Sequence, residues 1–514
     1  MSELGLRTRP DTYVDSVQLM AVTRTMLEQP GVGWAAAVMG TPANLAKLAD
    51  EGFGAGRLGD VAANDLALAV RAGTRQEADG ALAAGMGALA EAAPAPAGPQ
   101  EPTPPTLGAA VAAMGGANVA LISVPGPFAA LEAHKALSAG LHVLVFSDNV
   151  PMADEVELKT RGEELGLLVM GPGAGTGVLG GVGLGFANRL RRGPVGVVAA
   201  AGTGAQEVMT LVDRWGSGVS QVIGVGGRDL NEELGARMTR LAVAALEADP
   251  ATEVLVVVSK PPAPAVARSL LAGLGGKPTV AALVGLDDPP PAPPRVRLVG
   301  TLEEAAAAAG GRLGMPAPPP GAGLAGPVAR AAAGLGPGRG AVRGLFSGGT
   351  LCYEAMVLLS RELGPVHSNV PLRPAWGMPA PDGAHVCLDL GEEEHTRGRP
   401  HPMIDPEARV AQIRRQADDA STAVILLDVV LGHGAHPDPA SVLAPACADA
   451  AGRPGGPVVV AYVLGTDADP QGLAGQRGQL AEAGCLLAPT GARAALMAAA
   501  VSRGRPAVAE ARLP

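Results

Sequence analysis

The sequence predicts an α/β protein with several doubly wound parallel-sheet domains, preceded by a small α+β domain. Short apolar strand-like segments alternate with helix-like segments along most of the 514 residues, a pattern typical of parallel sheets that are buried on both faces. Two stretches rich in Pro, Ala and Gly interrupt the alternation and are expected to be linkers. The length itself suggests about three domains of roughly 100–200 residues each.

The first 92 residues follow a β-α-β-α-β-α order, which favours a small ferredoxin-like domain. The segment VQLMAVTRTMLEQ is predicted as a strand followed by a helix, and GVGWAAAVMG and NDLALAVRA are predicted as strands. The segment TPANLAKLADEGF is predicted as a helix capped by Thr41, because a threonine hydroxyl accepts a hydrogen bond from the first turn.

The rest of the chain is divided by two predicted linkers, residues 93–106 and 313–340. A glycine-rich turn at 171–193 separates the strands of the middle part into two groups. The predicted domains are a Rossmann-like domain over 107–190 and two flavodoxin-like domains over 191–312 and 341–514. The predicted strands are 118–124, 141–146, 165–170, 195–201, 219–225, 253–259 and 278–284, followed by AVRGLF, AHVCLDL, TAVILLDVV and GPVVVAYVL.

The composition excludes several classes of function. A formal net charge of −10 argues against non-specific nucleic-acid binding, which needs a basic surface. No apolar stretch of about 20 residues occurs, so no membrane span is expected, and MSELGLRTRP lacks the apolar core of a signal peptide. The cysteines, Cys352, Cys387, Cys447 and Cys485, form no CxxC pair, which predicts packed, reduced thiols of a cytoplasmic protein.

One loop motif occurs twice. Residues 202–207 (GTGAQE) and 349–354 (GTLCYE) both fit G-T-x-x-x-E, and each lies between an apolar strand-like run and a helix-like segment. The first turn of a helix has unpaired N–H groups that attract anions, and ligands of parallel sheets bind beyond the carboxyl ends of the strands. If the two domains pack loop to loop, both helix N-termini point at one anion.

The repeated loops therefore predict a phosphate site. Ser347 adds a hydroxyl group to the second loop, whereas Ala201 offers none to the first, so the second loop is expected to be better equipped. The alternative is that each loop is an ordinary turn before a helix. The candidate phosphate ligands are Gly202, Thr203, Gly204, Ser347, Gly348, Gly349, Thr350 and Arg228.

The charged residues near these loops each have a structural alternative. Arg228 can bind phosphate or a carboxylate through its forked guanidinium, or it can form a surface ion pair with Asp229. Glu207 and Glu354 lie in the first turns of the predicted helices, where a carboxylate can simply complement the helix dipole. Asp428, at the end of the strand ILLDVV, is also well placed.

Several stretches resemble succinyl-CoA synthetase. ISVPGPFAALEAHKALSAGLHVLVFSDNVP, followed by LGLLVMGPGAGTGVLG, resembles the CoA-binding domain of the alpha subunit, and residues 195–230 resemble its next domain. The part with FSGGTLCYEAM resembles the ligase domain of the beta subunit. The resemblance implies that both loops hold the phosphate of a phosphohistidine. It also implies that Pro125, Gly171 and Pro172 border the nucleotide part of CoA.

A closer resemblance is to FdrA proteins, which carry both ligase-type domains on one chain. It rests on KPPAPA, GGRDL, HTRGRPHPMIDP and ILLDVVLGHGAHPDPA and covers nearly the whole chain. The resemblance implies a carbamoyltransferase of ureide (allantoin) breakdown, in which oxalurate and phosphate give oxamate and carbamoyl phosphate. Phosphate or carbamoyl phosphate is then a substrate, CoA binding stays open, and companion subunits complete a hetero-oligomeric complex.

One feature of succinyl-CoA synthetase is missing. Its phosphoryl group passes through a histidine in a G-H-A-G loop, but the corresponding region here, residues 285–306, contains no histidine. No ATP-grasp domain precedes the second ligase-type domain either. The missing histidine argues against a phosphoenzyme ligase, and the resemblance to FdrA proteins implies carbamoyl transfer to phosphate. Two alternatives stay open, an acid–CoA ligase with a divergent relay and a non-catalytic regulatory subunit that binds CoA or another metabolite.

The segment HTRGRPHPMIDP concentrates polar side chains between two prolines. Its two histidines and an aspartate resemble metal spacing, but no helical i, i+4 pair is present, so no metal site is predicted. The segment is expected to bind the carboxylate or carbamoyl end of the substrate, with a neutral histidine that handles a proton near pH 7. A structural loop is the alternative. The predicted catalytic residues are His395, Arg399, His401 and Asp405.

Overall fold

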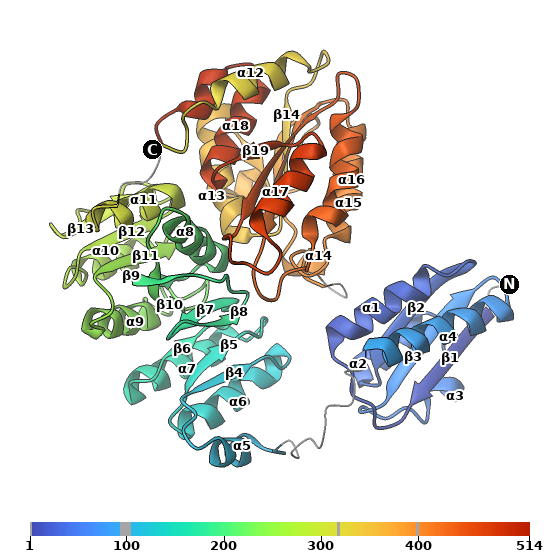
Figure 1. The fold of residues 1–514 in the computed structure, drawn as a ribbon. Coiled ribbons are helices and arrows are strands. Elements are labelled where there is room, and N and C mark those ends of the chain that lie inside the picture. The colour runs from blue at the N-terminus through green and yellow to red at the C-terminus, as the bar shows by residue number, and fades with distance from the viewer. Residues whose placement is uncertain (1–2, 93–103, 316–318, 397–399, 514) are drawn as a thin grey trace. The chain divides into compact units, whose positions relative to one another are not determined.

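The computed structural model describes residues 3–92, 104–315, 319–396 and 400–513. The chain divides into two compact units, one formed by the residues up to Thr103 and one that begins at Pro104. Figure 1 labels the helices and strands of both units. Most of the predicted linker 93–106 lies outside the described residues.

The N-terminal unit is a three-stranded antiparallel sheet of order β1-β3-β2 with helices on both faces. Helices α1 and α4 pack against Leu66, Leu68 and Val70, whereas Ala67 and Ala69 face the side of α2 and α3. Alternate residues of a strand point to opposite faces, so both faces of β3 are buried. The elements are β1 (Glu3–Arg9), α1 (Ser16–Leu27), β2 (Val32–Met39), α2 (Pro42–Asp50), α3 (Ala55–Leu58), β3 (Leu66–Ala72) and α4 (Arg75–Ala92).

The prediction of a strand at the start of VQLMAVTRTMLEQ is wrong. This segment is helical from its first residue to Leu27, and the first strand of the domain is β1, which no prediction covered. Leu19, Val22 and Met26 are buried and recur at three- and four-residue spacing, which is the period of a helix. Thr41 does cap α2, because its side chain accepts the N–H of Asn44.

The second unit begins with a small three-stranded parallel sheet of order β4-β5-β6. Its strands are shorter than predicted, but each lies within a predicted strand. The elements are α5 (Leu107–Met114), β4 (Val119–Ile122), α6 (Gly126–Ser138), β5 (His142–Val145), α7 (Met152–Leu165) and β6 (Val169–Met170).

The next sheet has seven strands in the order β13-β12-β11-β9-β10-β7-β8. Five strands are parallel, and the antiparallel hairpin β7-β8 extends one edge. This hairpin lies in the region 171–193 that the sequence predicted as a turn, so that prediction is wrong in part. The elements are β7 (Thr176–Leu179), β8 (Val182–Gly185), β9 (Arg192–Ala199), α8 (Gly202–Arg214), β10 (Val219–Gly224), α9 (Arg237–Ala248), β11 (Val254–Ser259), α10 (Pro264–Ala272), β12 (Thr279–Leu283), β13 (Val296–Val299) and α11 (Leu302–Arg312).

The last sheet has six parallel strands in the order β15-β16-β14-β17-β18-β19. All four strands predicted for this part are present. The elements are α12 (Ala325–Ala333), β14 (Ala341–Phe346), α13 (Gly349–Leu363), β15 (Val366–His367), η1 (Pro374–Trp376), β16 (His385–Asp389), α14 (Glu393–Thr396), α15 (Glu407–Asp418), β17 (Thr422–Val430), α16 (Pro439–Ala451), β18 (Val458–Leu464), α17 (Leu473–Glu482), β19 (Leu486–Ala488), α18 (Gly491–Arg503) and η2 (Pro506–Glu510).

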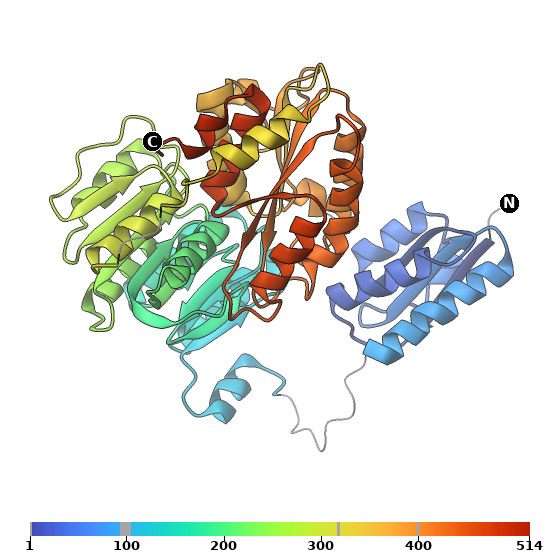
Figure 2. The ribbon, with the colours of Figure 1, turned by 45° about the horizontal axis from the view of Figure 1, so that its top comes forward.

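The two larger sheets share one hydrophobic core. Helices α8, α11, α13 and α18 contact one another and pack between the sheets, as Figure 2 shows. This packing brings the N-termini of α8 and α13 together. All four cysteines are buried and free, as the composition predicted. Within the described ranges, no helix is both long and apolar enough to span a membrane.

Candidate functional site

The two repeated loops meet where the two larger sheets pack together. The first loop joins β9 to α8, and the second joins β14 to α13. The N–H group of Thr350 donates a hydrogen bond to Oγ1 of Thr203 over 3.1 Å. Gly204 and Gly348 permit this close approach, because a Cβ on either would lie 2.9 Å from a threonine methyl group of the opposite loop. The loops face each other, as the repeated motif led us to expect.

A pocket of about 370 Å³ opens beside this contact. Gly202 and Thr203 line it from the first loop, and Ser347, Gly349 and Thr350 line it from the second. The pocket lies beyond the carboxyl ends of β9 and β14, the position that parallel sheets use for ligand binding. It is therefore the candidate site in this unit.

The backbone N–H groups of the two loops are used differently. Neither α8 nor α13 has a side-chain cap, so the first turn of each helix has N–H groups without an intrahelical partner. In the second loop, the Asp428 carboxylate accepts the N–H of Ser347 over 2.8 Å and the N–H of Gly348 over 2.7 Å. It also accepts the hydroxyl of Ser347 over 3.1 Å. The expectation that the second loop is better equipped is wrong, because a carboxylate of its own domain takes these donors.

Lys260 brings positive charge to the pocket and was not among the predicted site residues. It follows β11 directly, and it is the one Lys or Arg among the described residues that line the pocket. Its Nζ lies 5.7 Å from the ring centroid of Tyr353 and 3.8 Å from the position that a Cβ on Gly349 would take. The sequence signal was its place in KPPAPA, immediately after an apolar strand.

Asp389 is a second pocket residue that the sequence analysis missed. It ends β16, and its Oδ1 accepts the N–H of Gly391 over 3.0 Å. Its Oδ2 lies against Gly349, where a Cβ would collide with it. Burial raises the pKa of Asp389 to about 7, and the nearby ammonium of Lys260 opposes this rise. A carboxyl with this pKa exchanges protons readily at neutral pH.

His401 lines the same pocket as a neutral hydrogen-bond donor. The N–H of Met403 donates to its Nδ1 over 3.2 Å, so the neutral ring carries its proton on Nε2. The Nε2 atom lies close to Gly391: a Cβ added to this glycine would be only 2.6 Å from it. Burial lowers the pKa of His401 to about 4, and the rings of Phe186 and His401 lie 5.9 Å apart. The ring is therefore neutral near pH 7, and the handling of a proton by a histidine of this segment stays a prediction.

His395 and Asp405, two of the other predicted catalytic residues, are not brought to the pocket. His395 lies in the short helix α14, with its Nε2 3.2 Å from Oε1 of Glu394. The Asp405 carboxylate accepts the N–H of Glu407 over 3.1 Å, at the start of α15. Neither residue lines the pocket, and Arg399 lies outside the described residues.

Comparison with known proteins assigns the chain to a family. A model described as CoA-ligase matches residues 345–501. The uncharacterized protein YahF of Escherichia coli is 37% identical over 514 residues, which cover 95% of this chain and 97% of YahF. This chain belongs to the FdrA family. It is a succinyl-CoA-synthetase-related, CoA-ligase-like protein.

More distant relatives match parts of this FdrA chain. A succinate–CoA ligase (ADP-forming) alpha subunit of Archaeoglobus fulgidus is 34% identical over 116 residues, which are 22% of this chain and 40% of that subunit. The crystal structure of PH0766 from Pyrococcus horikoshii covers 76% of this chain and 85% of its own, with 14% identity and a TM-score of 0.31.

The N-terminal unit of the FdrA chain also matches a family model. This model is described as the heavy metal-associated domain of AllF and covers residues 1–104. These residues include neither cysteine nor histidine, whose thiolate and imidazole groups are the usual ligands of soft metals. The donor set therefore does not fit a heavy-metal site.

Arg228 of the FdrA chain binds a carboxylate of the small sheet's domain. Its Nη2 lies 2.6 Å from Oε2 of Glu155 and donates to the carbonyl oxygen of Val150 over 2.8 Å. Asp229 instead pairs with the buried Lys159 over 2.9 Å. Both predictions for Arg228, a phosphate contact and an ion pair with Asp229, differ from this arrangement. Arg228 joins two parts of the unit.

Glu207 and Glu354 do not simply complement their own helix dipoles. Glu207 accepts the N–H of Gly491, the first residue of α18, over 3.0 Å, and the hydroxyl of Tyr462 over 2.6 Å. Glu354 accepts the N–H of Leu302, the first residue of α11, over 2.7 Å. Each ligase-type domain thus supplies a carboxyl that caps a helix of the other. Burial raises the pKa of Glu207 to about 7 and that of Glu354 to about 8.

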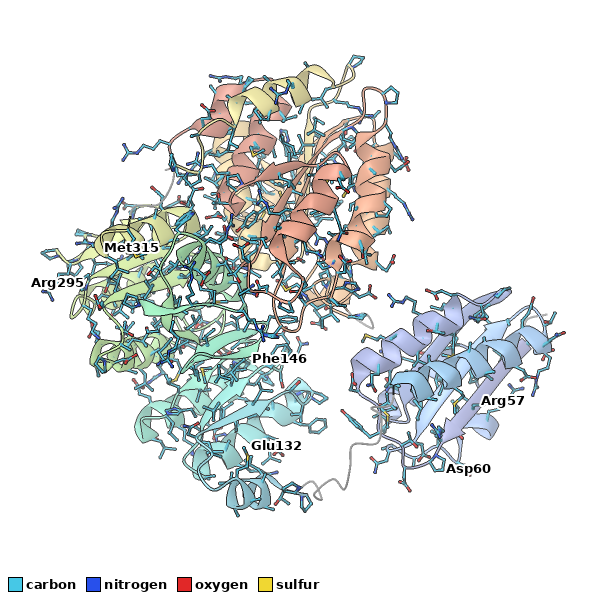
Figure 3. All side chains as sticks on the ribbon, in the orientation of Figure 1. Arg57, Asp60, Glu132, Phe146, Arg295 and Met315 are labelled. Atoms are coloured by element: carbon cyan, nitrogen blue, oxygen red, sulfur yellow. The ribbon has the colours of Figure 1, made fainter. Side chains whose placement is uncertain are left out.

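The residues expected to border CoA lie around the small sheet of the FdrA chain. Pro125 precedes α6, and the Gly171–Pro172 peptide bond is cis. None of the three lines the pocket, whereas Asp148 and Phe146 do. Figure 3 labels Phe146 near the small sheet. Asp148 is a carboxylate, which disfavours an anionic nucleotide next to it. CoA binding stays a prediction.

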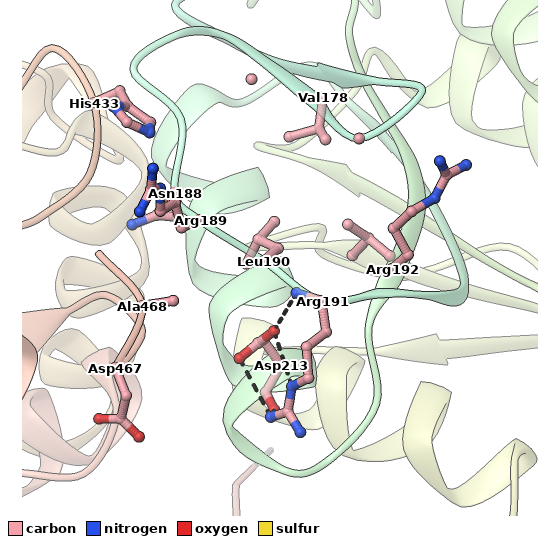
Figure 4. A pocket seen from close by; sticks show the side chains of 13 residues that line it. Val178, Asn188, Arg189, Leu190, Arg191, Arg192, Asp213, His433, Asp467 and Ala468 are labelled. Carbon is pink, nitrogen blue, oxygen red and sulfur yellow. Dashed lines mark hydrogen bonds and ion pairs between the residues drawn. The ribbon is translucent and has the colours of Figure 1, made fainter. Parts of the chain in front are cut away.

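A second hollow, of about 630 Å³, lies between the β7-β8 hairpin and the loops after β17 and β18. Figure 4 shows its arginines, of which Arg191 donates through its N–H to Oδ2 of Asp213 over 2.7 Å. Asp469 accepts the N–H of Arg189 over 2.7 Å and the side-chain amide of Asn188 over 2.7 Å. Through these hydrogen bonds, the segment after β8 contacts both ligase-type domains, the first at Asp213 and the second at Asp469.

Proposed function

We propose that this chain is a subunit of a carbamoyltransferase that converts oxalurate and phosphate to oxamate and carbamoyl phosphate. The observation that carries the proposal is the combination in one pocket of an uncapped helix N-terminus, Lys260 and a neutral histidine donor. The first two features suit an inorganic anion, and the third suits a carbonyl oxygen. The resemblance to FdrA proteins supports the same reaction.

In this proposal phosphate binds against the first turn of α8. The N–H groups of Gly202, Thr203 and Gly204 have no intrahelical partner there, and the positive end of the helix dipole adds to their attraction for an anion. Lys260 supplies a full charge from the neighbouring strand. The second loop contributes less, because Asp428 already occupies two of its N–H groups.

The carbamoyl carbonyl is polarised by His401 in this proposal. His401 lines the pocket with its Nε2 beside Gly391, and the ring stays neutral at pH 7 because burial lowers the pKa to about 4. A fixed donor of this kind stabilises the negative charge that develops on a carbonyl oxygen during acyl transfer. It needs no change of its own protonation state.

An acid–CoA ligase is the second candidate, supported by the CoA-ligase model and the succinate–CoA ligase relatives. That reaction needs a histidine that accepts a phosphoryl group. Residues 285–306 have none, and in His401 the N–H of Met403 occupies Nδ1, so the ring proton is on Nε2. These observations favour carbamoyl transfer over the ligase.

The test uses the chain co-expressed and purified with the proteins encoded beside it. Incubation with oxalurate and phosphate is expected to yield carbamoyl phosphate, measured as citrulline after ornithine carbamoylation. Incubation with ATP, CoA and succinate is expected to yield no acyl-CoA and no acid-labile phosphohistidine. The opposite pair of results would establish the ligase instead, and tight metabolite binding without any turnover would favour a regulatory subunit.

A further inference from the structure

We propose that Asp389 transfers the protons of the reaction, from its Oδ2 atom to the leaving nitrogen of the carbamoyl donor and back from phosphate. This inference rests on the proposed carbamoyl transfer and names the acid–base group that the transfer requires. No residue of HTRGRPHPMIDP fills that role among the described residues, because His401 stays neutral and His395 and Asp405 lie outside the pocket.

The two carboxyl oxygens of Asp389 have separate surroundings. Oδ1 accepts the N–H of Gly391 over 3.0 Å. The part of the chain that the structure describes supplies no hydrogen-bond donor to Oδ2, which lies beside Gly349 at the start of α13. One oxygen is therefore anchored, and the other is available to a molecule in the pocket.

The backbone around Asp389 is held rigidly. The side chain of Asn369 donates to the carbonyl oxygen of Asp389 over 2.9 Å and accepts its N–H over 3.0 Å. The strand β16 pairs with β14, and Asp389 lies opposite Phe346 in that register. Because Phe346 leads directly into the second loop, the carboxyl is positioned by the same strand that positions the pocket.

Gly349 and Lys260 complete the surroundings of Oδ2. Any side chain at position 349 would collide with the carboxyl, so glycine keeps the space between Asp389 and the pocket open. The Lys260 ammonium lies near the same point and attracts the phosphate that is the second reactant. The proton-transfer group and the anion-binding group therefore face one small volume, the arrangement that acid–base catalysis requires.

The proposed step balances in atoms, charge and protons. An oxygen of HPO₄²⁻ forms a bond to the carbamoyl carbon of oxalurate, and the bond from that carbon to the oxamate nitrogen breaks. The protonated Asp389 gives its proton to that nitrogen, which leaves as the neutral amide of oxamate. The resulting carboxylate takes the proton that came with phosphate, and carbamoyl phosphate leaves as a dianion. Asp389 ends the cycle protonated.

The protonation state of Asp389 supports this cycle. Burial raises its pKa to about 7, so both forms are populated near neutral pH. An acid matched to the working pH is efficient in both directions. Because the first step uses the protonated form, kcat/KM for oxalurate should fall as the pH rises through about 7.

The decisive experiment compares wild type, D389N and D389E in the purified complex. D389N is expected to lower kcat with oxalurate about 100-fold or more while phosphate binding to the chain, measured by calorimetry, changes little. With D389E, kcat/KM for oxalurate should be lower but should still decrease as the pH rises above 7. With D389N, the residual kcat/KM should no longer depend on pH in this range. D418N, at an exposed carboxyl paired with Arg453, is the matched control.

A second donor separates proton transfer from a structural role. The p-nitrophenyl ester of carbamic acid has a leaving group that needs no proton. With this donor, the loss of kcat in D389N relative to wild type should be at least tenfold smaller than with oxalurate. The assignment of proton transfer to Asp389 would be overturned by an equal loss of kcat with both donors. It would also be overturned if kcat/KM of D389N still decreased as the pH rises above 7. A wild-type complex that makes no carbamoyl phosphate refutes the proposed function itself. A productive wild type with fully active D389N refutes only the role of Asp389.

Discussion

The loop before α8 and the loop before α13 share the pattern G-T-x-x-x-E, but their backbone N–H groups have different partners. In the second loop, Asp428 accepts the N–H groups of Ser347 and Gly348. In the first loop, the N–H of Ala200 donates instead to the carbonyl oxygen of Val258 over 2.9 Å, and neither α8 nor α13 has a side-chain cap of its own. A carboxylate of its own domain therefore accepts N–H groups of the second loop, and the first loop has no such carboxylate among the described contacts.

Strand register explains this difference. Val257 pairs with Val198 in the first domain, and Leu427 pairs with Leu345 in the second. The next residues, Val258 and Asp428, therefore occupy equivalent positions beneath the two loops. A Cβ on Gly204 would lie 2.9 Å from Cγ1 of Val258, so an apolar side chain lies where the second domain has a carboxylate.

The comparison shows how one repeated element can serve two purposes. The second loop is stabilised internally, because Asp428 also pairs with the buried Arg409 over 3.1 Å. The first loop gains no such contact from Val258 and keeps the electrostatic potential of a free helix N-terminus. In the proposed function, phosphate takes the place of that carboxylate.

The largest expected effect is on stability, from D428N. This change leaves the Arg409 guanidinium buried without its charge partner, which typically costs about 3–5 kcal/mol. The measurement is the free energy of unfolding from urea titration. D418N, at an exposed ion pair, should cost roughly 0–1 kcal/mol. A D428N protein as stable as D418N would mean that the second loop does not depend on its internal anion.

The next effect concerns ligand binding by V258D. The new carboxylate should lie beneath the first loop as Asp428 lies beneath the second and repel an anion there, so phosphate affinity should fall at least about 100-fold, or 2.7 kcal/mol. Calorimetric titration with phosphate measures it, with V258T as the uncharged control of similar size. Unchanged affinity in a folded V258D chain would show that phosphate binds elsewhere.

A smaller effect is expected from K260M. It removes the charge that assists phosphate binding but leaves the helix N-terminus, so the Kd for phosphate should rise roughly 10- to 150-fold, the equivalent of about 1.5–3 kcal/mol. The matched control is K277M, because Lys277 donates to the carbonyl oxygens of Leu246 and Asp249 away from the pocket. Similar phosphate affinity in the two variants would remove Lys260 from the site.

The smallest effect is the pH dependence of the two capping glutamates. Their pKa values are raised to about 7 and about 8 in the folded chain, so folding binds protons and stability falls as the pH rises from the unfolded pKa through these values. E207Q and E354Q should remove this loss. Each should melt roughly 2–4 °C higher than wild type near pH 9 and almost equally near pH 4, below the unfolded pKa of a glutamate. A constant difference across that range would contradict the shifts.

Much of the fold could be predicted because its signals are local. Apolar runs such as VGVVAAA and TAVILLDVV are buried strands, and the repeated Gly-Thr loops do start helices. The errors also have local causes. VQLMAVTRTML contains β-branched residues, but the spacing of Leu19, Val22 and Met26 is helical. The β7-β8 hairpin is rich in glycine, which concealed its two short strands.

The sequence by itself determined the α/β alternation, the family and the two loops, since each depends on residues close together in the chain. The tertiary structure alone decided which donors stay free. Asp428 lies about 80 residues from the loop it fills, and Glu207 caps a helix that begins at Gly491. Lys260, Asp389 and His401 come from three separate segments. Partners of this kind depend on sheet order and domain packing, which no local pattern encodes.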